Sequence, residues 1–550
     1  PQEDADKIAI NAFETAASLY DEIDKSQKQA NALHSLGFSR YSADNSPVVV
    51  PLKTAAELYR ETSEFESAAR VYSHLVVFEV KNENIESAVD WLDRIDGFKE
   101  VIDDKAVKAV VAGAEALIKA KQDQLDAAIS LLEEASIEQG STMDKAIFGS
   151  VQLIVAHLAQ NEGEFDAAVK LATSARDLAE DTGTIKAIAQ SEETLAGALA
   201  AQGHWEDVPE HLVAAASYYV EIDHIEEAAG CFDRVASIEL MSNDYETAIE
   251  HARQGLDLID GALPEMEASI KLTLAHIFAS YGDRDSLEDT LSEVEAVLSS
   301  EDNPDKHIEA QVQTHRGELC LKEEKPQEAI EHFESATDYY ATVEDIQLQI
   351  TTKLQLADAL RDAHKVEEAI DKLEEVIDLT TNAEKEFFYA LALLKKSDLH
   401  REEGSLDSAM ESTEAVLELE ETSLNQLILA RAQHQLGSIQ AEKGQYDSAQ
   451  KVLTDALSTG RQLDSDHFVV DLLKDLVEIA VETDQPKQVI SWCESAESYI
   501  KSSDEDFAPE AKLYFIKTRA QRQAPEDGVE DLLYVGLRYL KMDQVDDALQ

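Results

Sequence analysis

Cysteine and proline are scarce in this chain, with 3 cysteines and 10 prolines among 550 residues. Cys231, Cys320 and Cys493 lie far apart in the sequence, and no CxxC pair occurs. Three such cysteines cannot all pair within one chain, so a disulfide framework is not expected. Unpaired thiols are typical of a reducing compartment, and the sequence therefore predicts a cytoplasmic protein.

Basic residues are also few, because 47 Lys and Arg stand against 113 Asp and Glu, for a net charge of −66. Backbone contacts to DNA or RNA and docking on an anionic membrane both need Lys and Arg clusters, so this charge argues against them. A hydrophobic content of 44% indicates a folded core rather than a disordered acidic tail. The charge therefore lies on the surface of a folded protein. We expect a partner with a basic face, while adaptation to high salt stays open.

The sequence has neither a long apolar run nor a catalytic signature. No stretch of 18 apolar residues is present, so direct membrane insertion is not expected. HExxH, GxSxG, P-loop, dinucleotide-binding and calcium-loop patterns are all absent. His204 and His211 are seven residues apart, but no third ligand is close to them in sequence. We expect no enzyme activity, no cofactor and no metal site.

A repeat with a period of about 40 residues organises most of the chain, and such a period is typical of repeat architectures. A small or aliphatic residue, here called the anchor, returns in twelve units that keep register. Chance does not maintain such a register, so repeats must be considered before any other fold assignment. The anchors are Ala88, Ala128, Ala168, Val208, Ala248, Leu287, Ala329, Ala369, Ala409, Ala449, Val489 and Val529.

Each unit has the pattern of two helices joined by a short turn. The stretch "EKGQYDSAQKVLTDAL" at 442–457 shows it, with apolar residues four and seven places after the anchor, on one helix face. Gly444, five places before the anchor, suits a left-handed turn that ends the first helix. We name the first helix of a unit helix A and the second helix B. Alternating β-branched runs are almost absent, so the predicted fold is all-α.

These residues resemble the tetratricopeptide repeat family. The segment from Leu436 matches its pattern at Gly437, Gly444, Tyr446, Ala449, Leu453 and Ala456, and another segment matches at Gly317, Ala329, Phe333 and Ala336. The resemblance covers roughly residues 60–550 and implies a right-handed superhelical solenoid of stacked antiparallel helix pairs. The period of this chain exceeds the family's usual length of about 34 residues, as in its long-repeat members.

The sequence predicts three parts. Residues 1–45 form a helical pair, and residues 46–60 form a proline-bounded linker and a first helix. Residues 61–550 hold about twelve helix pairs. Because "DQVDDALQ" begins another helix and a solenoid normally closes with a polar cap, we expect the array to be truncated at this end.

The resemblance implies that the A helices line the inner surface, where a partner binds. Arg361 and Arg401 stand eight residues before successive anchors, and an aspartate precedes each by three. The arginines suggest a basic spot that binds an acidic side chain or a peptide carboxylate. Alternatively, the aspartates and arginines are only intrahelical pairs. The candidate binding residues are Arg361, Arg401, Arg431, His434, Asp358 and Asp398.

The expected function is a non-catalytic scaffold or adaptor that binds a partner protein or peptide on the concave face. The alternative is a regulatory or sensory array within a larger transcription regulator or signalling ATPase, in keeping with the expected truncation. Self-association is left open, since no feature of the sequence indicates it.

Overall fold

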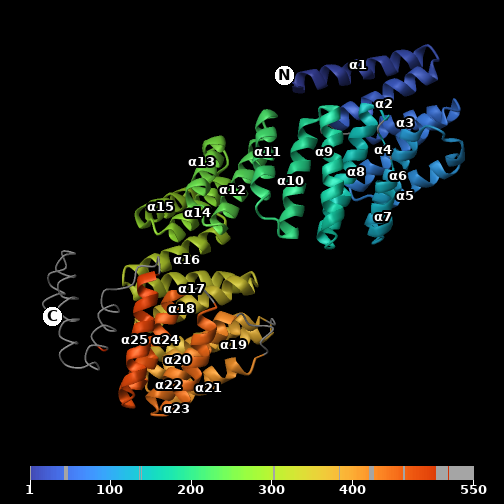
Figure 1. The fold of residues 1–550 in the computed structure, drawn as a ribbon. Helices are drawn as coiled ribbons and strands as arrows, with labels where there is room; N and C mark the ends of the chain where they lie inside the picture. The colour runs from blue at the N-terminus through green and yellow to red at the C-terminus, as the bar shows by residue number, and fades with distance from the viewer. Residues whose placement is uncertain are drawn as a thin grey trace. The chain divides into compact units, whose positions relative to one another are not determined.

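The computed structural model describes residues 2–42, 48–135, 137, 139–300, 304–382, 385–419, 426–462, 465–502 and 518. The described residues form 25 α-helices, one 3-10 turn and no strand (Figure 1), which confirms the predicted all-α fold. The last predicted anchor, Val529, lies outside the described residues.

The helices have the following bounds: α1 Gln2–Glu22, α2 Ser26–Ser42, α3 Val49–Glu61, α4 Phe65–Lys81, α5 Ile85–Asp96, α6 Lys105–Lys121, α7 Leu125–Glu134, α8 Thr142–Asn161, α9 Phe165–Thr182, α10 Ile185–Gln202, α11 Val208–Glu221, α12 Ile225–Met241, α13 Tyr245–Ile259, α14 Pro264–Tyr281, α15 Arg284–Ser299, α16 Lys306–Lys322, α17 Pro326–Thr342, α18 Ile346–Asp362, α19 Val366–Asn382, α20 Glu386–Glu402, α21 Leu406–Leu417, α22 Gln426–Glu442, α23 Tyr446–Gly460, α24 Asp466–Glu482 and α25 Pro486–Ser502. The 3-10 turn η1 is Lys99–Val101.

Helix starts follow the sequence repeat. From α17 to α25, the odd-numbered helices begin at Pro326, Val366, Leu406, Tyr446 and Pro486, which keep the same spacing as the anchors. Even-numbered helices from α4 to α24 are the A helices, and odd-numbered helices from α5 to α25 are the B helices. Three helices, α1, α2 and α3, come before α4, and α3 begins at Val49.

The turn from helix A to helix B is a hydrogen-bonded left-handed cap. Gly444 has φ 74°, and its N–H donates to the carbonyl of Ala441 at 2.9 Å. The N–H of Gln445 donates to the carbonyl of Gln440 at 2.8 Å, which completes the Schellman pattern. Asp123 and Glu324 adopt the same positive φ at equivalent turns. The repeated geometry therefore does not require glycine in every unit, and this explains the varied sequence at this position.

The anchors fill the space between neighbouring helices. Ala369, Ala409 and Ala449 are fully buried. Gly437 of α22 packs so closely on Leu453 of α23 that an added Cβ would lie 2.5 Å from its Cγ. Interiors packed to this density do not admit an extra methyl group without movement. The small residues of the pattern thus set the distance between helices.

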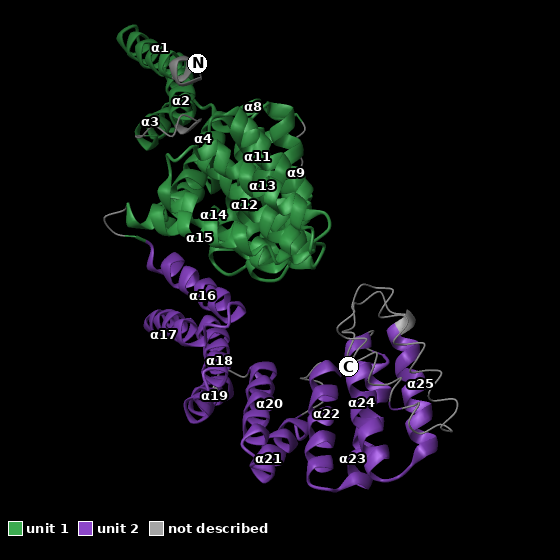
Figure 2. Cartoon of the chain, turned by 90° about the vertical axis from the view of Figure 1, so that its left-hand side faces the viewer, with its two compact units in different colours: residues 1–304 green, residues 305–550 purple. Residues whose placement is uncertain are grey.

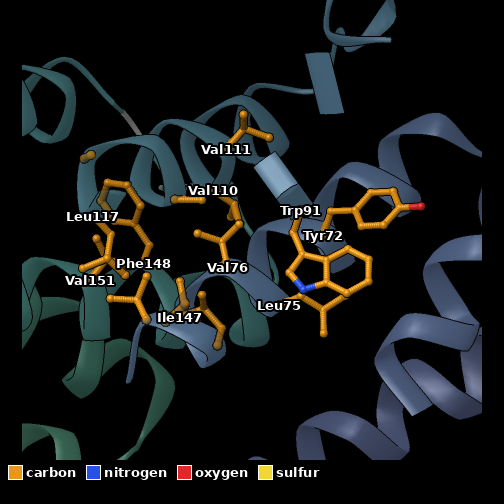
Figure 3. Close-up of a cluster of buried hydrophobic side chains, with 14 of the residues drawn as sticks. Tyr72, Leu75, Val76, Trp91, Val110, Val111, Leu117, Ile147, Phe148 and Val151 are labelled. Atoms are coloured by element: carbon orange, nitrogen blue, oxygen red, sulfur yellow. The ribbon is translucent and has the colours of Figure 1, made fainter. Parts of the chain in front are cut away.

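The described chain forms two compact units, residues 1–304 (unit 1) and residues 305–550 (unit 2), coloured separately in Figure 2. In the core of unit 1, Tyr72 of α4 and Trp91 of α5 stack with ring centroids 5.8 Å apart (Figure 3). Val111 of α6 and Phe148 of α8 extend the same cluster. This core thus joins residues from several successive repeats.

Successive A helices also contact one another within each unit. In unit 1 such contacts join α4 to α6, α6 to α8, α8 to α10 and α12 to α14. In unit 2 they join α16 to α18, α18 to α20, α20 to α22 and α22 to α24. The A helices of unit 2 therefore form a continuous layer, and any groove on it is built from several repeats. None of the helices in the described part of the chain is long and apolar enough to cross a membrane.

Candidate functional site

A groove of about 490 Å³ lies on the A-helix layer of unit 2. We call it the A-layer groove. It crosses α20, α22 and α24, which follow one another in Figure 2, and reaches the first residue of α23. Its lining residues are Arg401, His434, Ser438, Ala441, Glu442, Tyr446, Asp471, Lys474, Asp475, Glu478, Ile479 and Glu482.

One part of the groove is apolar. Ile479 is buried in the core between α23, α24 and α25, while Tyr446 and Ala441 are partly buried against the same core. These side chains are positioned by the repeat, because Tyr446 is the aromatic residue that follows the turn glycine. The repeat pattern therefore supplies a firm apolar surface at the end of the groove nearest the turn.

The middle of the groove holds a hydrogen-bonded bridge between α22 and α24. The Nε2 of His434 lies 3.0 Å from Oδ2 of Asp475, and the Oγ of Ser438 donates to the same oxygen at 2.6 Å. Burial opposes ionisation of Asp475, but the hydrogen bonds from His434 and Ser438 outweigh it and hold the pKa of this carboxyl below its ordinary value. The bridge links α22 to α24.

This Ser, His and Asp set differs from a nucleophilic triad. In a triad the imidazole accepts the proton of the serine hydroxyl while the carboxylate holds the other ring nitrogen. Here Ser438 and His434 both bond the same carboxylate oxygen, and the single Ser438 hydroxyl proton is shared with the backbone carbonyl of His434, 3.0 Å from Oγ. The contacts therefore brace the helices and do not activate the hydroxyl.

Negative charge dominates the groove lining. Five carboxylates face the two basic side chains Arg401 and Lys474, and the Nε of Arg401 lies 3.7 Å from Oε1 of Glu442. The acidic residues are Glu442, Asp471, Asp475, Glu478 and Glu482. Four of them follow α24 at intervals of four, three and four residues, and therefore share one face of this helix.

The structure brings part of the predicted basic spot together, because the charges of Arg361 and Arg401 both act on the carboxyl of Asp398. Arg401 and His434 line the groove. Arg361 forms its ion pair with Asp362 at 3.1 Å, and both carboxylate oxygens of Asp358 accept hydrogen bonds from Lys395 of α20 at 2.7 Å.

The two remaining candidates also lie on A helices. Burial raises the pKa of Asp398, although the charge of Arg401 opposes this shift. Arg431 is exposed on α22. A binding role for the six residues stays a prediction, since their positions alone do not test it.

Sequence reasoning missed the acidic face of α24. Asp471, Asp475, Glu478 and Glu482 carry a signal, because their spacing of one helical turn follows the inward positions of helix A. Because the chain has 113 acidic residues, the same spacing also arises elsewhere by chance. The four residues are identified only by their place in the groove lining.

Within the described ranges, no three His, Cys, Asp or Glu side chains are placed to hold a metal ion. Cys231, Cys320 and Cys493 are buried and form no disulfide, and Cys493 is fully enclosed, as its position in the repeat predicts. Burial raises the pKa of the Cys231 thiol to about 12, so this side chain stays protonated and unreactive at neutral pH.

Unit 1 contains a second polar cluster, which is buried inside the protein. The Nε of Arg70 lies 2.8 Å from Oδ1 of Asp144, and the Nε2 of His74 lies 3.8 Å from the same oxygen. The Nε2 of His34 lies 3.2 Å from Nδ1 of His74. Burial, with the nearby charge of Arg70, lowers the pKa of both histidines to about 3. These neutral imidazoles join α2 to α4, while Asp144 joins α4 to α8.

Comparison with known proteins agrees with the helix-pair repeat. The family model described as tetratricopeptide repeat matches residues 430–459, which span most of α22 and α23. The unit that this model matches recurs along the described chain with the same positive-φ turn and the same buried anchor. Comparison with curated proteins gives no match.

Several solved structures resemble parts of the helical array. A signal transduction ATPase with a tetratricopeptide repeat sensor from Pyrococcus horikoshii aligns with 90% of this chain and 72% of its own, at 12% identity and a TM-score of 0.43. The apo quorum sensor NprR from B. thuringiensis aligns with 59% of this chain and 96% of its own, at 15% identity and a TM-score of 0.40. The Cut9–Hcn1 hetero-tetramer of the APC/C aligns with 94% and 96%, at 12% identity and a TM-score of 0.37.

Proposed function

We propose that this protein is a non-catalytic interaction scaffold that binds a partner protein or peptide with a basic face in the A-layer groove. The observation that carries the proposal is the net negative groove built across three successive A helices. Stacked helix pairs hold such a surface in a fixed shape without any chemistry of their own. No cofactor is needed for this role.

The charge of the whole chain supports the same partner class. A net charge of −66 attracts basic molecules over distances of roughly a Debye length, about 8 Å at physiological salt, and speeds their association. Single exposed ion pairs contribute only about 0.2–1 kcal/mol, so specificity requires several pairs arranged in a matching geometry. The groove offers that arrangement.

The candidate residues from the sequence keep a place in the proposal. Arg401 and His434 lie inside the groove, where they contact Glu442 and Asp475 and hold these carboxylates in place. Arg361, Asp358, Asp398 and Arg431 lie on the same layer of A helices, in α18, α20 and α22. We include them as contacts for acidic and polar groups of the same partner.

Affinity capture with the full chain tests the proposal. The variant Glu478→Lys with Glu482→Lys reverses two groove charges. The control Glu411→Lys with Glu414→Lys reverses two exposed glutamates of α21, outside the groove. We expect wild-type and control proteins to retain the same basic partners at low salt, and the groove variant to lose them. Retention of the same proteins by all three forms, or capture that does not change with salt, would contradict the proposal.

Two further expectations belong to the proposal. Buried cysteines without a disulfide agree with a reducing, cytoplasmic location. The alternative function, a sensory array in a larger transcription regulator or ATPase, is tested by the reading frame around residues 1–550. A nucleotide-binding or helix-turn-helix segment there would favour the alternative, and further repeats followed by a stop codon would remove its basis.

A further inference from the structure

Three exposed apolar side chains stand at consecutive turns from helix A to helix B in unit 1. Trp205 lies in the turn between α10 and α11, Met241 ends α12, and Tyr281 ends α14. Their exposed fractions are 46%, 71% and 54%. Across the described residues, no other turn of this kind carries an exposed large apolar side chain. We call these three residues the turn-edge patch.

The repeat closes most of its A helices with a polar residue. The last residues of these helices, in chain order, are Lys81, Lys121, Asn161, Gln202, Met241, Tyr281, Lys322, Asp362, Glu402, Glu442 and Glu482. Met241 and Tyr281 depart from this series on neighbouring A helices, and both stay exposed, so packing within the repeat does not explain them. Single exposed apolar residues are common, but a group of them at one edge indicates an interaction surface.

Trp205 is exposed because its B helix starts late. The other B helices of the described array begin three residues before their anchors, whereas α11 begins at its anchor, Val208. A helix that began at Trp205 would need an N–H at position 209 to bond the Trp205 carbonyl, and Pro209 has none. Trp205 therefore stays on the turn, where its ring is open to a partner.

The aromatic side chains of adjacent turns contact each other. Tyr245, the first residue of α13, lies with its ring centroid 5.5 Å from that of Tyr281. The hydroxyl of Tyr245 donates to Oδ1 of Asn243 at 2.8 Å, which holds the half-buried ring on the turn. Trp205 and Met241 have the same separation in sequence as Tyr245 and Tyr281, and occupy the equivalent positions one repeat earlier. The patch is therefore built by consecutive repeats along one edge of unit 1.

Carboxylates accompany the apolar side chains at each of the three turns. The exposed acidic residues there are Glu206, Asp207, Asp244, Glu246 and Asp285. Arg284 adds one exposed positive charge at the last turn, so the surroundings of the patch stay net negative. The faces of Trp and Tyr rings also attract cations. An apolar surface with this border complements a partner that is apolar and basic, and it repels a second copy of this acidic chain.

We propose that the turn-edge patch binds a segment of a partner protein in which apolar side chains alternate with lysines or arginines. Trp205, Met241 and Tyr281 supply the apolar contact, since aromatic residues and methionine are enriched at the centres of protein interfaces. The carboxylates of the turns pair with the basic side chains of the partner. This surface differs from the A-layer groove, because the groove residues belong to unit 2.

Three synthetic peptides separate the apolar contribution from the charge. The first is a fluorescein-labelled peptide of leucine and lysine, the second has serine for each leucine, and the third has glutamate for each lysine. Fluorescence anisotropy with the full chain is expected to show about tenfold tighter binding of the first peptide than of the second. The third peptide should not bind, because its charge has the sign of the chain.

Glutamine variants locate the apolar contribution. Met241→Gln with Tyr281→Gln gives both helix ends the residue that ends α10, Gln202. This variant should lose the preference for the leucine–lysine peptide and bind the serine–lysine peptide as the wild type does. The control, Val343→Gln with Ile346→Gln, changes two exposed apolar residues of unit 2 and should keep the preference. All four side chains are exposed, and circular dichroism checks that helix content is unchanged.

Tryptophan fluorescence places the peptide on the protein. Trp205 is exposed, whereas Trp91 is buried and Trp492 is half-buried, so an unlabelled leucine–lysine peptide should shift the emission to shorter wavelength. Trp205→Phe should abolish this shift.

Four results would overturn the proposal. They are equal affinity for the first two peptides, binding of the glutamate peptide as tight as that of the lysine peptide, a preference that survives in the Met241 and Tyr281 variant, and a preference lost equally in the control. Self-association of the full chain that this variant abolishes in analytical ultracentrifugation would also overturn it, because the patch would then bind a second copy.

Discussion

The two units place similar polar side chains in opposite environments. In unit 1, Arg70, Asp144, His74 and His34 form a cluster inside the protein, and Asp144 is completely buried. In unit 2, His434, Asp475 and Ser438 form a related cluster on the wall of an open groove. Removal of one partner from the first cluster would leave an unpaired charge buried away from water, which costs much stability. In the second cluster, solvent screens the charges, so each contact contributes less. Within the same helix-pair frame, one charged cluster is thus buried in the protein interior and the other lies in an open groove.

Removal of the buried carboxylate should have the largest effect. Asp144→Ala leaves the Arg70 guanidinium without its partner and also breaks the capping box that Asp144 forms with Ser141. We expect a loss of about 3–5 kcal/mol in the stability of this region. Hydrogen–deuterium exchange of the full chain measures it in α4 and α8. A loss below about 1 kcal/mol, the range of an exposed ion pair, would show that the cluster does not hold unit 1 together.

Acidification should destabilise unit 1 before unit 2. The pKa values of His34 and His74 are about 3 in the folded protein and about 6.5 when unfolded, so the unfolded state binds more protons at intermediate pH. The contribution of these histidines to stability is therefore fully present above pH 6.5 and falls as pH drops toward 3. We expect a loss of about 2–3 kcal/mol between pH 7.5 and 5.5.

The control for this pH effect is a variant with His34→Gln and His74→Gln, which should lack the slope between pH 7.5 and 5.5. In unit 2, the pKa of Asp475 is lowered, so its contribution to stability is lost only at a lower pH than that of the histidines. Its contribution is present above about pH 4, the ordinary value for aspartate, and is lost below it. Exchange rates that rise equally in both units at pH 5.5 would contradict the assignment.

Two glycines test the packing that both units share. Gly437→Ala in α22 would place a Cβ 2.5 Å from Leu453, whereas a Cβ at Gly230 in α12 meets nothing within 4 Å. We expect the first change to cost about 1–3 kcal/mol and the second to stabilise by about 0.5–1 kcal/mol. Thermal unfolding followed by circular dichroism should thus shift in opposite directions. A shift of the same sign for both would mean that helix spacing is not set at Gly437.

The bridge between His434 and Asp475 should contribute least to stability. His434→Ala removes a half-buried contact to Asp475 across α22 and α24. We expect a change of less than about 1 kcal/mol, because the groove is open to solvent and Ser438 keeps its own bond to Asp475. Exchange protection of α24 measures this change. A loss above about 2 kcal/mol, which exceeds what an exposed pair contributes, would place this bridge with the cohesive cluster of unit 1.

The periodicity of the sequence was sufficient to predict the repeated helix pairs. The anchor spacing, the turn at Gly444 and the burial of Ala449 and Cys493 follow from a pattern that every unit repeats. The same period places His34 and His74 at equivalent positions of neighbouring helices.

The buried cluster of unit 1 and the A-layer groove of unit 2 are built from residues that differ between repeats. Asp144 pairs with Arg70 at a sequence spacing that is not a multiple of the period, so the repeat does not predict this contact. The partners of Arg361 and Asp358 were also missed, because nearby side chains compete with the intrahelical pairs that the sequence suggests. The groove itself arises from three helices whose inward residues differ, so no single unit contains its signal.

Selection of random phage-displayed peptides on the full chain tests the central claim most directly, because it presumes no partner. The claim predicts selected sequences rich in lysine and arginine. Their binding should be lost in the variant Glu478→Lys with Glu482→Lys and kept in the variant Glu411→Lys with Glu414→Lys. Selected peptides that are not basic, or that bind both variants equally, would contradict the claim that the A-layer groove displays its charge for a partner.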